Sequence, residues 1–116
     1  SYMIHAKFFR DTRGAVQLEM SGHALAAPTE EDMVCAAATT LAYTLAQAVQ
    51  FAYEQGWLAT APTIKICDGY AHIVARPKPM YEAETLLMFW TVQAGAYTVE
   101  RNYPSALCLM PMEIGR

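Results

Sequence analysis

A thiol, an imidazole and a carboxylate lie close together in the first third of this sequence. Cys35 follows His23 by twelve residues, and Asp32 precedes the cysteine by three. A thiolate is the reactive form of cysteine, and it forms where a base accepts the thiol proton or where a helix N-terminus favours negative charge. The grouping therefore predicts nucleophilic chemistry, with Cys35 as the nucleophile and His23 as the base.

Each of these residues also has a purely structural interpretation. A cysteine in a helix is more often a small buried apolar residue, and Asp32 suits the cap of a helix as well as the orientation of His23. Glu30, Glu31 and Asp32 add negative charge that opposes a thiolate at Cys35. Either a protonated His23 compensates for that charge, or the loop carries the two glutamates away from the sulfur.

The other two cysteines lie in short apolar runs, around Cys67 and Cys108. Both are predicted to be inert core residues. Three cysteines at these spacings match no metal-binding motif, so we expect neither a metal nor a cofactor.

Composition indicates one domain spanning residues 1–116, in which Ser1-Tyr2 resembles a cloning remnant before a natural start at Met3. Hydrophobic residues make up 54% of the chain and charged residues 16%, an apolar excess that a second copy would cover. The net charge of −3, with no basic patch, argues against direct nucleic-acid binding. We find no signal peptide and no apolar run of membrane-spanning length, so we expect a cytoplasmic protein with reduced thiols.

The hydrophobic pattern predicts an α+β domain of order ββαββαβ, with a mostly antiparallel sheet packed with two helices. A polar turn that ends at Gly14 joins the first two strands, and Asp68-Gly69 joins the next two as a two-residue hairpin. The expected strands are residues 2–10, 15–21, 63–67, 70–76 and 106–110, and the expected helices run to residue 54 and over 81–101.

Two starts compete for the first helix. Thr29 with Asp32 resembles a capping box, whereas Asp32 as the N-cap places Cys35 at the third helical position. In the second case, backbone N–H groups around Cys35 are unpaired and suit an oxyanion. The buried face of this helix is predicted to hold Val34, Ala38, Leu41, Leu45, Ala48 and Ala52. In the second helix, which Gly95 weakens, the residues suited to burial or a subunit contact are Leu87, Trp90, Val92 and Tyr97.

The pair of motifs Gly22-His23-Ala24 and Asp32-Met33-Val34-Cys35-Ala36-Ala37 resembles the signature of the ribosomal-processing cysteine protease (Prp, or YsxB-like) family. The resemblance implies a homodimeric bacterial peptidase that removes a short N-terminal extension from a large-subunit ribosomal protein. It places the nucleophile at Cys35 and the base at His23. Gly22, Ala36 and Thr39 then line the site, and no membrane is involved.

The chain departs from the family pattern at two positions. Glu30 stands where family members usually carry glycine, in the loop that admits substrate, and Thr39 stands where they often carry serine. The loop change keeps open an alternative function, a non-catalytic dimeric module that binds ribosomal proteins. A third possibility, an RNA-binding α+β domain, is disfavoured by the acidic balance of the chain.

Overall fold

The structure, a computed structural model, describes residues 3–22 and 28–113. Its elements follow the predicted order ββαββαβ, and the predicted α+β class is confirmed. The strands are β1 (Ile4–Arg10), β2 (Val16–Ser21), β3 (Thr63–Cys67), β4 (Tyr70–Ala75) and β5 (Leu107–Met110). The helices are α1 (Pro28–Glu54) and α2 (Glu82–Asn102), with a 3-10 turn, η1 (Pro79–Tyr81), before α2.

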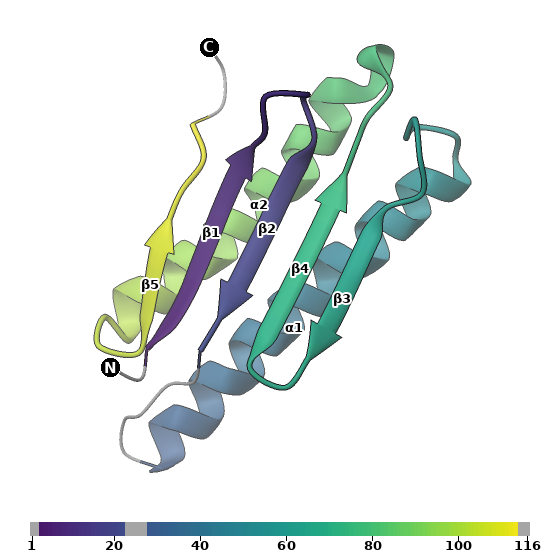
Figure 1. The fold of residues 1–116 in the computed structure, drawn as a ribbon. Coiled ribbons are helices and arrows are strands. Elements are labelled where there is room, and N and C mark those ends of the chain that lie inside the picture. The colour runs from purple at the N-terminus through teal and green to yellow at the C-terminus, as the bar shows by residue number, and fades with distance from the viewer. Residues whose placement is uncertain (1–2, 23–27, 114–116) are drawn as a thin grey trace.

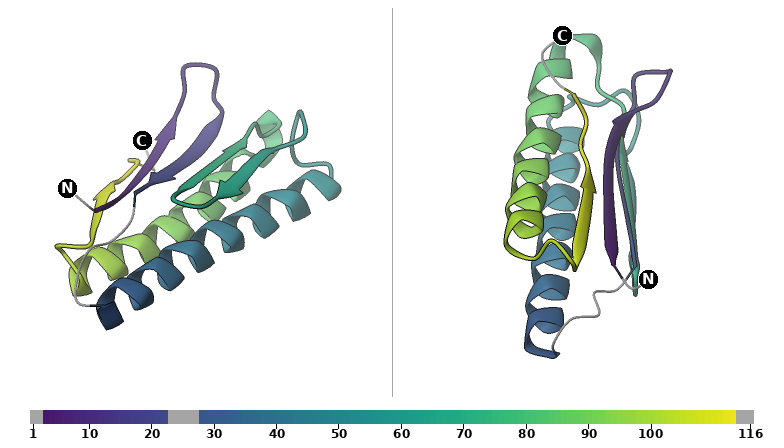
Figure 2. Two further views of the ribbon diagram at one scale, coloured as in Figure 1. Left: turned by 60° about the horizontal axis from the view of Figure 1, so that its bottom comes forward. Right: turned by 90° about the vertical axis from the view of Figure 1, so that its left-hand side faces the viewer.

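The five strands form one sheet in the order β3-β4-β2-β1-β5 (Figure 1). The neighbours β3, β4, β2 and β1 pair antiparallel, whereas β5 runs parallel to β1. Both helices cover the same face of the sheet, and the opposite face carries no layer of helices in the described part of the chain (Figure 2). The fold is therefore a two-layer sandwich of the kind that buries one side of a sheet.

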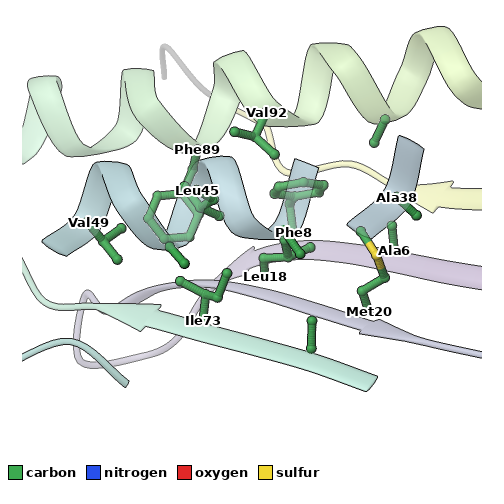
Figure 3. Close-up of a cluster of buried hydrophobic side chains, with 14 of the residues drawn as sticks. Ala6, Phe8, Leu18, Met20, Ala38, Leu45, Val49, Ile73, Phe89 and Val92 are labelled. Carbon is green, nitrogen blue, oxygen red and sulfur yellow. The ribbon is translucent and has the colours of Figure 1, made fainter. Parts of the chain in front are cut away.

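Period-two alternation places the apolar side chains of the central strands toward the helices. Phe8, Leu18 and Ile73 are buried there, and they meet Leu45 of α1 and Phe89 of α2 (Figure 3). The predicted buried face of α1 is confirmed, since Val34, Ala38, Leu45 and Ala52 are buried, and Leu41 and Ala48 are half-buried.

Gly95 does not interrupt α2, contrary to the weakness expected there. A Cβ atom at this position would lie 2.6 Å from Cδ2 of Leu41. The missing side chain therefore lets α1 and α2 approach each other at Leu41, and the packing gained there offsets the low helix propensity of glycine.

The start of α1 differs from both predicted starts. The helix begins at Pro28, so Thr29 and Asp32 are its second and fifth residues, and Asp32 is not the N-cap. Proline suits the first helical position because its φ is already helical and its missing N–H would be unpaired there anyway.

Within the described residues, Asp32–Glu54 is long and apolar enough to cross a membrane by length and composition, so the prediction that no such run exists is wrong. In this fold the segment serves as a core helix. Its inner side packs on the sheet through buried residues such as Val34, Leu45 and Val49. The uncharged outer side accounts for the hydropathy.

The junction after β2 depends on a glycine. Gly22 has φ +103°, a conformation that side-chain-bearing residues rarely adopt, and a Cβ atom there would clash with the carbonyl oxygen of Met3. Its N–H donates to the carbonyl oxygen of Gly69 at 3.0 Å. One residue thus joins the start of β1, the end of β2 and the β3–β4 turn.

We expect Gly22→Ala to lower the free energy of unfolding by about 3 kcal/mol, because backbone strain and a clash with main-chain atoms add together. Gly14→Ala is the matched control. Gly14 also has a positive φ, of +84°, but an added Cβ there meets no atom within 4 Å, so its cost is the backbone strain of about 1 kcal/mol. Urea denaturation of both variants checks this, and equal losses would contradict the role assigned to the Met3 contact.

Candidate active site

Cys35 is half-buried on α1 and lines a pocket between that helix and one end of the sheet. It is the eighth residue of the helix, not the third. In regular α-helical geometry its N–H is therefore paired with the carbonyl four residues earlier. The predicted set of unpaired N–H groups around Cys35 is thus wrong, because the helix begins a turn sooner than expected.

The pocket has an apolar floor and a partly polar rim. From α1, Thr39 lines it one turn beyond Cys35, as predicted for a site-lining residue, whereas Ala36 is exposed and is not part of the lining. The β3–β4 turn contributes Asp68 and Gly69 to the lining, next to the end of β2. The remaining lining residues are Ile4, Met20, Ser21, Gly22, Ala38, Ala42, Ile66, Cys67, Tyr70 and Ala71.

Gly22 places the end of β2 at the pocket, as predicted, and the next residue in the chain is His23. The predicted base itself lies outside the described residues, so the His23–Cys35 pair stays a prediction. Asp32 is exposed on α1 three residues before Cys35. Because Asp32 lies inside the helix, it is not a cap. Its other predicted role, the orientation of His23, stays a prediction.

Thr39 differs from the neighbouring helical threonines in the use of its hydroxyl. Thr40 and Thr44 donate to the carbonyl oxygens of Ala36 and Thr40, at 2.8 and 2.7 Å. Among the described residues, no partner receives a hydrogen bond from the Thr39 hydroxyl. A hydroxyl beside the pocket is therefore available to a bound molecule.

Tyr70 brings a polar network to the rim. Its hydroxyl donates to Oε2 of Glu19 at 3.1 Å, and burial together with this carboxylate raises the pKa of Tyr70. On the same open face of the sheet, Nε2 of His72 lies 2.8 Å from Oε1 of Gln17. His5 is exposed on β1, so neither of these histidines lines the pocket, in agreement with the surface or packing roles predicted for them.

The prediction of two inert core cysteines is wrong for Cys67. Cys67 is exposed and Cys108 is half-buried. Along β3, Ile64 and Ile66 pair with the inward-facing residues of β4, so Lys65 and Cys67 face the open side of the sheet.

Two further pocket residues, Asp68 and Tyr70, were not predicted from the sequence. The signal for them was present in the Asp68-Gly69 hairpin, whose turn meets the end of β2. A hairpin signal locates the turn along the chain but does not say which distant strand it lies against.

Within the part of the chain that is described, no group of three histidine, cysteine or acidic side chains is arranged to hold a metal ion. Among the described residues that line the pocket, Asp68 carries the carboxylate. The chemistry that the described geometry offers is thus a half-buried thiol in a mainly apolar pocket, with the Thr39 hydroxyl beside it.

Comparisons with known proteins agree with this geometry. The sequence model of the cysteine protease Prp family matches residues 3–107. No curated protein sequence matches the chain.

Several solved structures share the fold, among them the three that follow. SMU.848 from Streptococcus mutans superposes with a TM-score of 0.68 at 22% identity, covering 97% of each chain. The essential ribosomal processing protease Prp from S. aureus, in complex with a substrate peptide, gives a TM-score of 0.62 at 24% identity, covering 96% of this chain and 100% of the other. The same protease with a covalently linked product peptide gives 0.60 at 25% identity, with the same coverage.

The family match over most of the chain identifies this two-layer α+β domain, with its thiol in a pocket at the end of the sheet, as a small cysteine peptidase. This chain belongs to the cysteine protease Prp family. The resemblance seen in the two motifs is confirmed, and the enzyme class is that of a cysteine protease.

We expect brief treatment of the folded protein with iodoacetamide to modify Cys67 readily, because its side chain is exposed. In Cys67→Ser, the remaining fast modification should fall on Cys35, since Cys108 is half-buried on β5 and outside the pocket. Peptide mapping by mass spectrometry measures both. A Cys67 that reacts only after unfolding in urea would contradict the orientation described for β3.

Proposed function

We propose that this protein is a cytoplasmic endopeptidase that removes a short N-terminal extension from a large-subunit ribosomal protein. The observation that carries the proposal is that Cys35 lines a pocket together with Gly22, the residue before His23. Family membership supports the enzyme class. The S. aureus protease of the same fold is described as a ribosomal processing protease and was seen with a covalently linked product peptide.

In the proposed reaction, Sγ of Cys35 attacks the carbonyl carbon of the scissile peptide bond, and the thiol proton passes to His23. The tetrahedral adduct collapses as the C–N bond breaks, and His23 returns the proton to the leaving amine. The product bound to the enzyme is a thioester. Water then attacks this thioester with His23 as the base, which releases the new carboxylate and restores the thiol.

The oxyanion of the adduct needs hydrogen-bond donors other than the N–H of Cys35, which regular helix geometry pairs within α1. The Thr39 hydroxyl is a candidate, since it lines the pocket and no described residue accepts its proton. Removing one oxyanion donor typically lowers kcat by about 10²–10³-fold. Thr39 therefore takes a supporting position in the proposal, behind Cys35 and His23.

Incubation with the extended ribosomal precursor from the same genome, followed by intact mass measurement, tests the proposal. Cys35→Ser and His23→Ala should each lose cleavage by about 10³-fold or more, because nucleophile and base act as one unit. Cys108→Ser is the control and should keep its rate, because Cys108 lies outside the pocket.

An unaltered precursor after incubation with the wild-type protein would contradict the peptidase. Binding without cleavage would then support the alternative that the departure at Glu30 keeps open, a non-catalytic module.

We also propose that the protein is a homodimer that pairs through the outer side of its helices. From Met33 to Tyr53 and from Leu86 to Val99 the helices carry no charged residue. The large apolar side chains exposed on them are Met33, Tyr43, Phe51, Tyr53, Leu87, Trp90 and Tyr97. An apolar face of this kind on a small soluble domain is typical of a subunit interface.

Light scattering at micromolar concentration should give about twice the chain mass of 12.9 kDa. Gln47 is exposed on α1, one helical turn from both Tyr43 and Phe51. Gln47→Arg should shift the mass toward the monomer, because it places a charge among these apolar side chains while keeping good helix propensity.

The same substitution on the open sheet face, Gln17→Arg, is the control and should leave the mass unchanged. A wild-type monomer throughout the concentration range, or a dimer unaffected by Gln47→Arg, would contradict this interface.

A further inference from the structure

The sheet has one edge whose backbone groups are unpaired among the described residues, and it is the edge of β3. The N–H of Gly22 donates to the carbonyl of Gly69, which fixes the alternation of hydrogen bonds along β4. Hydrogen bonds to β2 recur at every second residue of β4 counted from Gly69, so the backbone groups of Ala71 and Ile73 point to β2. The residues between them, Tyr70, His72 and Val74, point their backbone groups to β3. On β3, the backbone groups of Ile64 and Ile66 therefore point away from the sheet.

No described residue pairs with these outward groups. Apart from the ladder with β4, residues 63–67 take part in no hydrogen bond with the residues that the structure describes. The edge strand carries no proline and no bulge, the usual devices that block strand addition. Its one lysine, Lys65, lies with Nζ 5.7 Å from the ring centroid of Tyr70, over the open face of the sheet.

The opposite edge is closed in a different way. The N–H of Leu109 on β5 donates to Oε2 of Glu100 at 2.8 Å. Beyond the strand, Gln93 accepts from the N–H of Met112 at 2.8 Å and donates to its carbonyl oxygen at 3.3 Å. Side chains of α2 thus cover the β5 edge at Leu109 and Met112, while β3 offers its outward donors and acceptors to another chain.

The open edge leads to the pocket that holds Cys35. Ile66 and Cys67, at the end of β3, line the pocket together with Thr39 of α1. Leu41 of α1 faces α2, and residues two positions apart in a helix lie about 160° from each other around its axis. Thr39 therefore faces away from α2, on the flank of α1 that lies beneath β3.

We propose that the substrate extension binds as a sixth strand on the free edge of β3, which delivers the scissile bond to Cys35. This inference rests on the proposed peptidase function and specifies how the same site takes its substrate. Main-chain hydrogen bonds to Ile64 and Ile66 supply affinity that is independent of sequence. Specificity then comes from the side chains of the extension, which point to alternate faces of the sheet.

Alternation sets the kind of extension that fits. Side chains of an added strand that point toward the helix layer lie beside Ile64 and Ile66, both of which face the helices. Side chains of the other parity lie beside Thr63, Lys65 and Cys67, which are exposed. The preferred substrate is an extended segment with apolar residues at every second position near the cleavage site, and polar residues between them are tolerated.

The first test uses a synthetic peptide that spans the extension of the ribosomal precursor, with single backbone N-methyl groups. Methylation should raise KM about tenfold or more at every second amide and by less than about threefold at the amides between them. Ile64→Pro should produce a similar rise in KM. Proline at this residue removes an outward N–H and leaves the β3–β4 ladder intact. Lys7→Ala, on β1 and three strands away from β3 in the sheet, is the control.

The second test does not depend on turnover or on the Ile64 variant folding. Hydrogen exchange is followed in Cys35→Ser with and without the same peptide. The amides of Ile64 and Ile66 should become protected at least about tenfold on binding, while that of Lys65, already paired with β4, should change little.

Three results would overturn the inference. Cleavage in which the N-methyl effect on KM does not alternate, or in which the amides of Ile64 and Ile66 are not protected, would contradict the added strand but not the peptidase. Absence of both cleavage and binding removes the two together. Protection of Ile64 and Ile66 that is already present without peptide and grows with protein concentration would assign the edge to a second copy of the chain.

Discussion

The hydrogen bond from the Gly22 N–H to the carbonyl of Gly69 is the constraint on which the rest of the site depends. It joins the last residue before His23 to the turn between β3 and β4. It also sets which backbone groups of β4 face β2 and, by alternation, which groups of β3 face outward. One contact thus fixes the end of β2 at the pocket and identifies the groups of β3 that face outward. The positive φ of Gly22 and its place beside the Met3 carbonyl both require a residue without a side chain at this point.

The local elements could be predicted from the sequence because their signals are local. Alternation of apolar residues and the Asp68-Gly69 turn predicted the bounds of β3 at Thr63–Cys67 without error. The parallel placement of β5 beside β1 was not predictable in the same way, because no local pattern records which strand lies next to a distant one. The start of α1 was missed because Pro28 was taken as a mark of irregular chain, although the first helical position is where proline fits.

The candidate site was predictable in part for a related reason. Cys35, Gly22 and Thr39 were identified from motif and spacing, and all three line the pocket. Asp68 and Tyr70 come from a segment more than thirty residues away in the chain, so their contribution depends on the pairing of β2 with β4. Cys67 was misplaced because its run was treated as uniformly apolar. Lys65 two residues earlier showed which parity of β3 faces solvent.

The depth of Cys35 within α1 changes how its thiol is to be activated. The helix dipole acts mainly within the first turn, and Cys35 is the eighth residue. Its backbone N–H is paired within the helix, so neither the dipole nor unpaired amides of the first turn supply the stabilisation expected for a cysteine at a helix start. The helix gives the thiol a fixed position against the sheet, and the charge balance must come from a side chain. In the proposed mechanism that side chain is His23, and an imidazolium beside the sulfur also offsets the acidic residues at the start of α1. In this proposed mechanism, activation of the thiol depends on His23 more strongly than on the helix that carries the nucleophile.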